Sequence, residues 1–446
     1  MSRTTEPRAG GPTVAVVGGG AVGVTAAADL AARDAAVTLF ERGDLGDGSS
    51  GRAAGVLYDA YAEDVDAALA ARAMERFREL SGSLPGFEFT PCPYVIAVRD
   101  GDDDAEAVPA MVDRMRAHGR DVSVVDPEAL GERFPLATDD LAVAAVAEGA
   151  GWADPGSYVS AMADRAREAG VTIETGVEVE LAEGGEGGDG GEVEEGGDGG
   201  DGGEGGNDTL EPTLRVDGTP RRFDAVVVAV GAHTERFFST AEVRLPVKPY
   251  RVQALVSDAA YDGPMTYDAT AGVYFRPHPA GLLAGDGTVP VEADPDDYDR
   301  DGDDWFVEDV SVTLRERARH DPAVDRAWAG LCTATPDGDP LVGPVADGVF
   351  VAAGWQGHGF MRAPAFGEHL ATGVLATLSP DDGEIEDGDG NASESEDANG
   401  NVSENEDGNE NADAESPWID AFDPTRFDGD ESFEIREGMT VRSRGD

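Results

Sequence analysis

Residues 13–41 read TVAVVGGGAVGVTAAADLAARDAAVTLFE, and this stretch predicts the start of a strand–helix–strand unit. Val14–Val17 form a continuous apolar run of the kind found in buried parallel strands. Ala21–Ala32 consist mostly of helix-forming residues, and Val37–Phe40 provide a second apolar strand. The fold class that we predict is therefore α/β, or α+β for the chain as a whole, beginning with a βαβ unit.

The turn between the first strand and the helix carries a GxGxxG pattern formed by Gly18, Gly20 and Gly23. The first glycine permits a sharp bend, the second admits a pyrophosphate, and the third lets helix and strand pack closely. Glu41 follows 18 residues after Gly23, at the end of the second strand, where a carboxylate can accept hydrogen bonds from a ribose. We predict dinucleotide binding rather than a loop that only turns the chain. The residues that carry this prediction are Gly18, Gly20, Ala21, Val22, Gly23 and Glu41.

The loop after Glu41 and Arg42 reads GDLGDGSSGRAAG over residues 43–55. A plain nicotinamide-binding domain would continue with a short turn and a helix, so this longer loop favours FAD over NAD. Backbone N–H groups around Ser49 and Ser50 could meet the phosphates. Arg52 could lie near the flavin or a substrate carboxylate, and a structural ion pair is the alternative for it.

A second glycine-rich stretch, GWQGHGFMRAPAFG, spans residues 354–367 and leads into an apolar helical run. Glycine allows close approach to the backbone at an entropic cost, so this clustering predicts a ligand packed against main chain. His358 lies at its centre and is a candidate for contact with that ligand or with a substrate.

Charge excludes some classes of partner. The chain has 446 residues, 91 of them acidic and 33 basic, and a formal net charge of −58. Nucleic acid and anionic membrane surfaces would be repelled by this field. Lys248 is the single lysine. Acidity spread over the whole chain is expected of a protein from a halophilic cytoplasm, and biased base composition is another explanation for the scarcity of lysine.

Cysteine content and hydropathy indicate the cellular compartment of the protein. Cys92 and Cys332 form neither a disulfide framework nor a metal-binding CxxC motif, which fits a reduced compartment and no metal site. The N-terminal residues contain no apolar signal region, and no apolar run reaches about 18 residues. We therefore expect a cytoplasmic protein with no membrane span.

The pattern along the chain predicts two domains and two acidic tracts. Further helices are predicted at 64–80, 107–118, 157–169, 313–328 and 361–378, with strands at 94–98, 171–174, 223–230 and 348–352. Alternating segments in 245–286 predict antiparallel strands. We predict a discontinuous dinucleotide-binding domain at 12–88, 151–232 and 331–379, with a disordered acidic insertion at 182–208. A mixed or antiparallel substrate domain would comprise 89–150 and 233–330, followed by a disordered acidic tract at 381–416.

Several motifs together resemble the FAD-dependent amine oxidoreductases of the D-amino-acid oxidase and sarcosine oxidase superfamily. Besides the stretches quoted above, the resemblance rests on AGWADPGSYVSAMADRAREAGVTIETG (150–176), AVVVAVGAHT (225–234), TPDGDPLVGP (335–344) and DPTRF (423–427, within a C-terminal motif at 417–427). Within this superfamily, the sequence motifs are most similar to those of glycine oxidase, sarcosine oxidase β-subunit and dimethylglycine dehydrogenase. The resemblance implies FAD spread across the Rossmann-type domain, with its flavin ring facing the substrate domain.

The resemblance also implies roles for individual residues. The residues that it implies as contacts of the cofactor are Arg42, Gly231, Gly354, Gly357, His358, Gly359, Phe360 and Met361. The helix starting near Gly357 would present free N–H groups to negative charge on the ring. On the substrate side, YFRPHP (274–279) offers Tyr274 as a pocket residue and Arg276 as a partner for a carboxylate. Met361 occupies the position of a carboxylate-binding lysine in sarcosine oxidases, and the adjacent Arg362 could replace it.

Two departures from the family pattern bear on mechanism. Leu283 replaces the lysine that helps sarcosine oxidases react with oxygen, which favours a dehydrogenase. Cys332 is displaced by two residues from the flavin-linked cysteine, so we predict non-covalent FAD.

The predicted activity is oxidation of the C–N bond of a small amine or amino acid by hydride transfer to the flavin. The class includes sarcosine, dimethylglycine, glycine and D-amino acids. Alternatives are a peroxide-forming oxidase and a flavoprotein subunit of a larger electron-transfer complex. An NAD-dependent dehydrogenase would leave the 354–360 loop unexplained.

Overall fold

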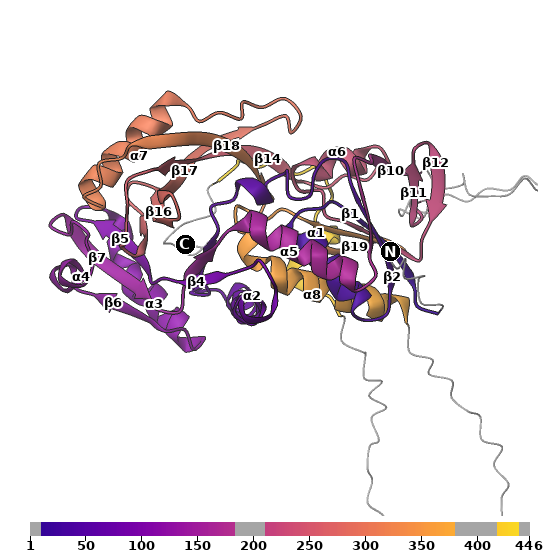
Figure 1. Ribbon diagram of the computed structural model, residues 1–446, viewed down its shortest axis with the longest axis horizontal. Coiled ribbons are helices and arrows are strands. Elements are labelled where there is room, and N and C mark those ends of the chain that lie inside the picture. Colours follow the sequence, from indigo (N-terminus) through magenta and orange to yellow (C-terminus); the bar gives the residue numbers. More distant parts are fainter. Residues whose placement is uncertain (1–9, 183–209, 380–416, 437–446) are drawn as a thin grey trace, which may run out of the picture.

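A computed structural model describes residues 10–182, 210–379 and 417–436. The chain forms two halves, one built on a six-stranded sheet and one on an eight-stranded sheet, at the right and left of Figure 1 respectively. Apart from Ala182, the predicted acidic tracts at 182–208 and 381–416 lie outside the described residues.

The six-stranded sheet has the order β19-β20-β13-β1-β2-β9. All neighbouring pairs are parallel except β19 with β20, which are antiparallel. Its strands are β1 (Thr13–Val17), β2 (Ala36–Glu41), β9 (Thr172–Thr175), β13 (Ala225–Val228), β19 (Leu341–Ala346) and β20 (Val349–Ala353). The continuous valine runs of β1 and β13 are explained by burial on both faces, as parallel sheets require.

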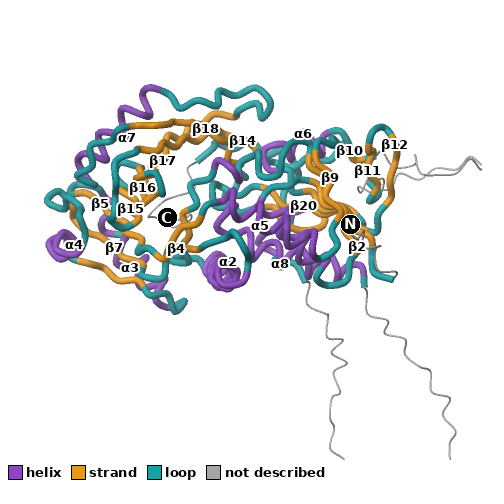
Figure 2. Tube along the Cα trace, in the orientation of Figure 1, coloured by secondary structure: helices purple, strands orange, loops and turns teal. Residues whose placement is uncertain are grey.

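Four helices pack together on one face of this sheet, as Figure 2 shows. They are α1 (Ala21–Ala31), α2 (Asp64–Ser83), α5 (Pro155–Glu168) and α8 (Gly359–Leu378). Val14 and Val16 point to this helical side, whereas Ala15 and Val17 belong to a second core on the other face. That second core is covered by α6 (Thr234–Ser239) and by an antiparallel sheet of β10 (Val179–Leu181), β11 (Thr213–Val216) and β12 (Thr219–Arg222).

The eight-stranded sheet has the order β18-β14-β17-β16-β15-β5-β7-β6 and is antiparallel except for the β15–β5 pair. Its strands are β5 (Tyr94–Arg99), β6 (Val122–Val125), β7 (Leu141–Ala147), β14 (Lys248–Ser257), β15 (Met265–Asp268), β16 (Val273–His278), β17 (Gly281–Glu292) and β18 (Val324–Ala334). Helices α3 (Val108–Ala117), α4 (Pro127–Arg133) and α7 (Asp304–Arg317) flank it. Phe306, Val310 and Leu314 of α7 recur at helical spacing and fill its core.

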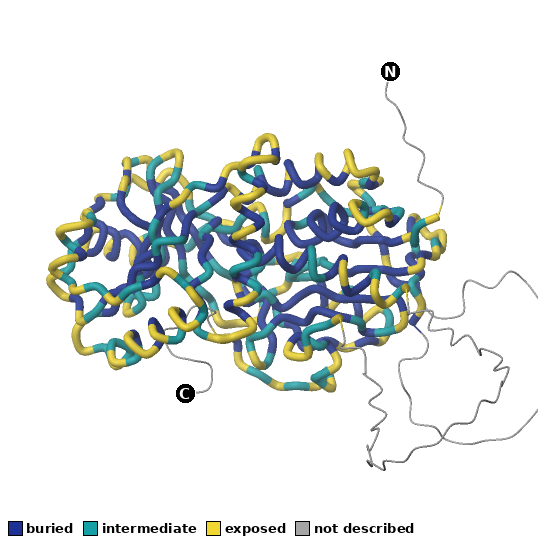
Figure 3. Tube along the Cα trace, turned by 90° about the horizontal axis from the view of Figure 1, so that it is seen from below, coloured by how far each residue is buried: buried dark blue, intermediate teal, exposed yellow. Residues whose placement is uncertain are grey.

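A third, small sheet consists of β3 (Val56–Leu57), β8 (Gly151–Ala153) and β4 (Phe89–Pro91). In sequence, these strands lie where the chain passes from one large sheet to the other. Figure 3 shows buried backbone running through both halves. Tyr94 and Met265 of the eight-stranded sheet belong to the same apolar core as Val14 of the six-stranded sheet. The two halves therefore share a packed junction.

The helix predicted at 313–328 is wrong in its position. The structure ends α7 at Arg317 and uses 324–334 for β18, which pairs with β14 along most of its length. Arg319 has a φ of 50° and Pro322 follows, so the helix cannot continue through this stretch. The sequence pattern merged the last turns of one helix with the start of a strand.

Candidate functional site

The GxGxxG turn packs backbone against backbone. Gly18 has a φ of 108°, and a Cβ atom there would lie 2.4 Å from the carbonyl oxygen of Ala229. A Cβ atom at Gly23 would lie 2.0 Å from the carbonyl oxygen of Gly18. Gly18 and Gly20 line a large cavity, whereas Gly23 holds α1 against β1. These placements suit a turn that offers bare main chain to a phosphate-bearing ligand.

The carboxylate of Glu41 is braced at the edge of the same cavity. The backbone N of Gly19 donates to its Oε2 at 2.7 Å, and the backbone N of Gly43 donates to its Oε1 at 2.8 Å. Both bonds come from glycine loops on either side of the side chain, so its orientation is fixed before any ligand binds. Gly231, with a φ of 56°, follows β13 and lines the cavity nearby.

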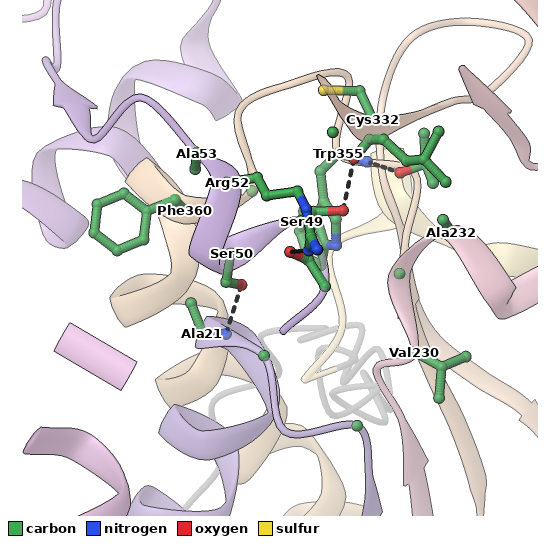
Figure 4. A pocket seen from close by; sticks show the side chains of 18 of the residues that line it. Ala21, Ser49, Ser50, Arg52, Ala53, Val230, Ala232, Cys332, Trp355 and Phe360 are labelled. Carbon is green, nitrogen blue, oxygen red and sulfur yellow. Dashed lines mark hydrogen bonds between the residues drawn. The ribbon is translucent and has the colours of Figure 1, made fainter. Parts of the chain in front are cut away.

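The serine loop ties α1 to the eight-stranded sheet. Ser50 Oγ accepts a 2.9 Å hydrogen bond from the backbone N of Ala21, at the start of α1, as Figure 4 shows. Ser49 Oγ donates to the carbonyl oxygen of Leu331 in β18 at 2.6 Å. Arg52 also lines the cavity, and its guanidinium donates to the carbonyl oxygens of Asp47 and Gly48.

The second glycine stretch lies at the other end of the cavity. Gln356 and Gly357 both have positive φ, and the backbone N of His358 donates to the carbonyl oxygen of Trp355 at 2.8 Å. This tight turn directs the N-terminus of the 20-residue helix α8 at the cavity. The helix end carries partial positive charge there. Gly354 instead packs on Thr335 and is not part of the lining.

Aromatic side chains gather near this helix end. Tyr58 stacks on Tyr61 and on Tyr94 with ring centroids 5.1 and 4.9 Å apart. His358 is 5% exposed, and its ring lies edge-on to Tyr61. Tyr58, Tyr94 and His358 all line the cavity. Burial, together with the neighbouring tyrosines, raises the pKa of Tyr58 well above its ordinary value, so its hydroxyl stays neutral.

Tyr274 lines the same end of the cavity from β16. It lies across Gly285 of β17, its partner in the sheet, where a Cβ atom would come within 2.2 Å of the tyrosine Oη. Gly285 therefore sets the position of this ring. The requirement for glycine here comes from the side chain packed above it.

The structure places two predicted arginines outside the lining. Arg276 donates to the carbonyl oxygen of Ala54 at 2.6 Å, and its guanidinium lies 4.7 Å from the centre of the Trp152 ring. Burial lowers the pKa of Arg276 to about 10, which still leaves it charged at neutral pH. Arg362 forms a 2.7 Å ion pair with Asp66. Contact of either arginine with a carboxylate stays a prediction, and both guanidinium groups already serve packing between elements.

Cys332 of β18 lines the cavity near Gly357. Burial raises the pKa of its thiol to about 12. At neutral pH the sulfur is therefore protonated, and a protonated thiol is a poor nucleophile.

The whole cavity measures about 550 Å³ and joins the Glu41 end to the tyrosine-rich end. Predicted residues that line it are Gly18, Gly20, Ala21, Val22, Glu41, Arg42, Ser49, Ser50, Arg52, Gly231, Tyr274, Gly357, His358, Gly359, Phe360 and Met361. Sequence reasoning missed Tyr58, Tyr94, Pro295, Tyr298, Arg300 and Trp355, which also line it. Figure 4 shows Ala21, Ser50, Arg52, Cys332, Trp355 and Phe360 around one part of this space.

The described residues contain neither a cluster of metal ligands nor a membrane-spanning helix. Within 10–182, 210–379 and 417–436, no cluster of three or more His, Cys, Asp or Glu side chains is arranged to hold a metal ion. Over the same ranges, no helix combines the length and apolarity needed to cross a bilayer.

Comparison with known proteins yields one family and several relatives. A sequence profile of the family described as FAD dependent oxidoreductase (DAO) matches residues 13–372. Glycine oxidase from Geobacillus kaustophilus is 27% identical over 376 residues, which cover 79% of this chain and 90% of that protein. Subunit A1 of anaerobic glycerol-3-phosphate dehydrogenase from Haloferax volcanii is 31% identical over 315 residues, which cover 68% of this chain but only 50% of that protein. The solved structure of L-proline dehydrogenase from P. horikoshii matches with a TM-score of 0.70 and 25% identity, covering 81% of this chain and 92% of that one.

Proposed function

Because this chain belongs to the FAD dependent oxidoreductase family, we propose that it oxidises the C–N bond of a small amine or amino acid. The observation that carries the proposal is the continuous cavity. It runs from the glycine turn and Glu41 to a neutral, tyrosine-lined end that faces the N-terminus of α8. Glycine oxidase and L-proline dehydrogenase, which this chain resembles, are named for substrates of this class.

The residues of the cavity fit FAD. Bare backbone at Gly18 and Gly20 suits a pyrophosphate, and the fixed carboxylate of Glu41 suits ribose hydroxyls. Gly357, His358 and Phe360 would lie against the flavin at the start of α8, where the helix dipole favours negative charge. Bound there, FAD supplies the hydride acceptor.

The chain's own residues orient the substrate and keep water out. Tyr274 and His358 line the cavity at its aromatic end and are the side chains that we propose to contact the substrate. Tyr58 and Tyr94 make the neighbouring wall apolar apart from their hydroxyls. Positioning of this kind accounts for a large part of the catalysis in bimolecular reactions.

We propose a dehydrogenase rather than an oxidase. Leu283 stands where the resemblance to sarcosine oxidases places a lysine, and a leucine supplies no cation. A cation near the flavin would assist transfer of electrons to oxygen. The acceptor in this proposal is therefore a molecule other than oxygen.

The deciding experiment is anaerobic reduction of the yellow protein in concentrated KCl. Sarcosine, dimethylglycine, glycine, proline and D-alanine are added in turn, and flavin absorbance is followed. We expect one of them to bleach the flavin and air to restore the colour slowly. Bleaching by none would overturn the amine proposal, and fast recolouring in air would replace the dehydrogenase with an oxidase.

The rate of flavin reduction should increase with pH. The reacting nitrogen must be neutral for hydride to leave the adjacent carbon, so the rate should fall about tenfold per pH unit below the pKa of the bound amine. Stopped-flow reduction at saturating substrate measures this. A flat profile from acid to alkaline pH contradicts the mechanism.

Gly285→Ala should impair reduction while leaving FAD in place. The new Cβ atom would overlap the hydroxyl of Tyr274 and displace the ring. Because misplacement by about 1 Å can cost about 100-fold in rate, we expect a 10- to 100-fold slower reduction. The control is Gly86→Asn, at an exposed turn where no atom lies within 4 Å of an added Cβ atom. Asparagine is chosen because it tolerates the positive φ of this glycine. An unchanged rate in Gly285→Ala would remove Tyr274 from the site.

FAD should leave the protein when it is denatured with acid. The high pKa of Cys332 disfavours a covalent link, and Cys92 is outside the lining. Precipitation with trichloroacetic acid should therefore leave all of the yellow colour in the supernatant. Colour retained in the pellet, and lost from the pellet in Cys332→Ser, would establish the link instead.

A further inference from the structure

Residues 293–303 join β17 to α7, and we call them the β17–α7 segment. The segment belongs to the eight-stranded half, yet Pro295, Tyr298 and Arg300 line the cavity. The residues opposite are Arg42, His233 and Arg236 of the six-stranded half, which line the cavity as well. In Figure 1 the chain around α7 and β17 extends along the top of the molecule toward α6. The segment thus bridges the two halves at the Glu41 end.

Asp296 makes the contacts across this bridge. Its Oδ1 accepts from Arg42 Nη1 at 3.2 Å and lies 3.0 Å from His233 Nε2, while its Oδ2 is paired with Arg236. Asp294 adds a 3.4 Å contact with Arg236. Although burial acts in the opposite direction, His233 and Arg42 lower the pKa of Asp296, so the carboxylate is ionised at neutral pH. One aspartate therefore meets three basic side chains in a strongly acidic protein.

The other end of the segment is anchored to its own sheet. Arg251 of β14 pairs with Asp303 at 2.6 Å and donates to the carbonyl oxygen of Asp299 at 2.9 Å. The backbone N of Ala329 in β18 donates to the carbonyl oxygen of Arg300 at 2.8 Å. Residues 299–303 are thus held to the sheet, whereas 294–298 reach outward. Among the described residues, the hydrogen bonds and ion pairs that join 294–298 to the six-stranded half run through Asp294 and Asp296.

Single ion pairs exposed to this degree contribute little to folding. Their position gives them a different effect. A ligand in the Glu41 end would contact Pro295, Tyr298 and Arg300, which line the cavity there. It would lose these contacts if the ion pairs broke and the segment moved away. Ligand binding and closure then favour each other by equal amounts, because the coupling is reciprocal.

We propose that the β17–α7 segment is part of the FAD site, and that Asp296 holds it closed over the adenosine end of the cofactor. Pro295 and Tyr298 cover that end, and Asp296 is a positioning residue that acts through Arg42, His233 and Arg236. Release of FAD therefore follows opening of the segment. The inference depends on the cofactor of the family and is independent of which amine is oxidised.

The test compares Asp296→Ala with Asp297→Ala in the FAD-loaded protein at one fixed KCl concentration. Asp297 is the neighbouring exposed aspartate, so the two variants lose the same charge from the same segment. The rate of FAD release is followed by the recovery of flavin fluorescence. We expect release to be about tenfold faster in Asp296→Ala, as the loss of several weak pairs would give, and about the wild-type rate in Asp297→Ala. Equal rates in the two variants would overturn the proposal.

A second measurement separates closure from a general loss of stability. Hydrogen exchange of peptides that cover residues 293–303 is compared with and without FAD. In the wild type and in Asp297→Ala, FAD should slow exchange there, and in Asp296→Ala this protection should be largely lost. The flavin-free forms of both variants should unfold at the same temperature. Exchange in this segment that does not respond to FAD in the wild type would also overturn the proposal.

Discussion

Gly18→Ala should bind FAD roughly 100-fold more weakly than the wild type. Alanine disfavours the φ of 108° found at this position, and its Cβ atom would lie 2.4 Å from the carbonyl oxygen of Ala229. Both obstacles are backbone, so no side chain can move to relieve them. Strain and overpacking each cost about 1–3 kcal/mol, and about 3 kcal/mol corresponds to roughly 100-fold in affinity. Fluorescence titration of the flavin-free protein with FAD measures the loss.

The control for this substitution is Gly82→Ala in α2. No atom lies within 4 Å of a Cβ atom built at Gly82, and alanine favours the helix there. This variant should bind FAD normally and be as stable as the wild type or slightly more. If Gly18→Ala retained full affinity, the glycine turn could not be the pyrophosphate site.

The sequence was sufficient to predict the six-stranded sheet's first unit, because local signals agreed there. A valine run, a glycine turn and an alanine-rich helix each favour the same strand–helix–strand arrangement, and β1, α1 and β2 match it within a residue or two. The order of the eight-stranded sheet could not be predicted in this way. The β15–β5 pairing joins strands about 170 residues apart, and no local pattern specifies such a partner.

In the candidate site too, features set by the local sequence could be predicted, and features set by distant contacts could not. Glycine positions such as Gly20 and Gly357 could be placed at the cavity because backbone exposure follows from residue type. The side chains of Arg276 and Arg362 could not be placed, because the direction of a side chain depends on the residues that pack around it. Arg276 shares a strand face with Tyr274 but meets Trp152 of the small sheet, and the side chain of Arg362 meets α2. The β17–α7 segment was missed because the sequence does not show which basic side chains Asp296 meets in the fold.

Asp66→Ala should destabilise the protein by about 3–5 kcal/mol, because it leaves a buried guanidinium without its counter-charge. The side chains of Arg362 and Asp66 are 3% and 10% exposed, and the pair joins the start of α8 to the first turn of α2. Burial alone would lower the pKa of Arg362, yet Tyr61 and Asp66 raise it above the ordinary value. A guanidinium stays protonated in proteins, so the charge persists when Asp66 is removed, and burying it without a partner destabilises the fold. Chemical unfolding of the flavin-free protein in KCl measures the change.

Two further variants decide whether burial is the cause. Asp164 and Arg167 form an exposed pair on α5, and Asp164→Ala should change the stability by less than about 1 kcal/mol. Adding Arg362→Met to Asp66→Ala removes the unpaired charge and should recover much of the lost stability, since an apolar pair can replace a buried ion pair. Equal losses for the buried and exposed aspartates would mean that Arg362 finds water or another partner. Its guanidinium would then be mobile enough to reach the cavity, and the predicted contact with a substrate carboxylate would regain support.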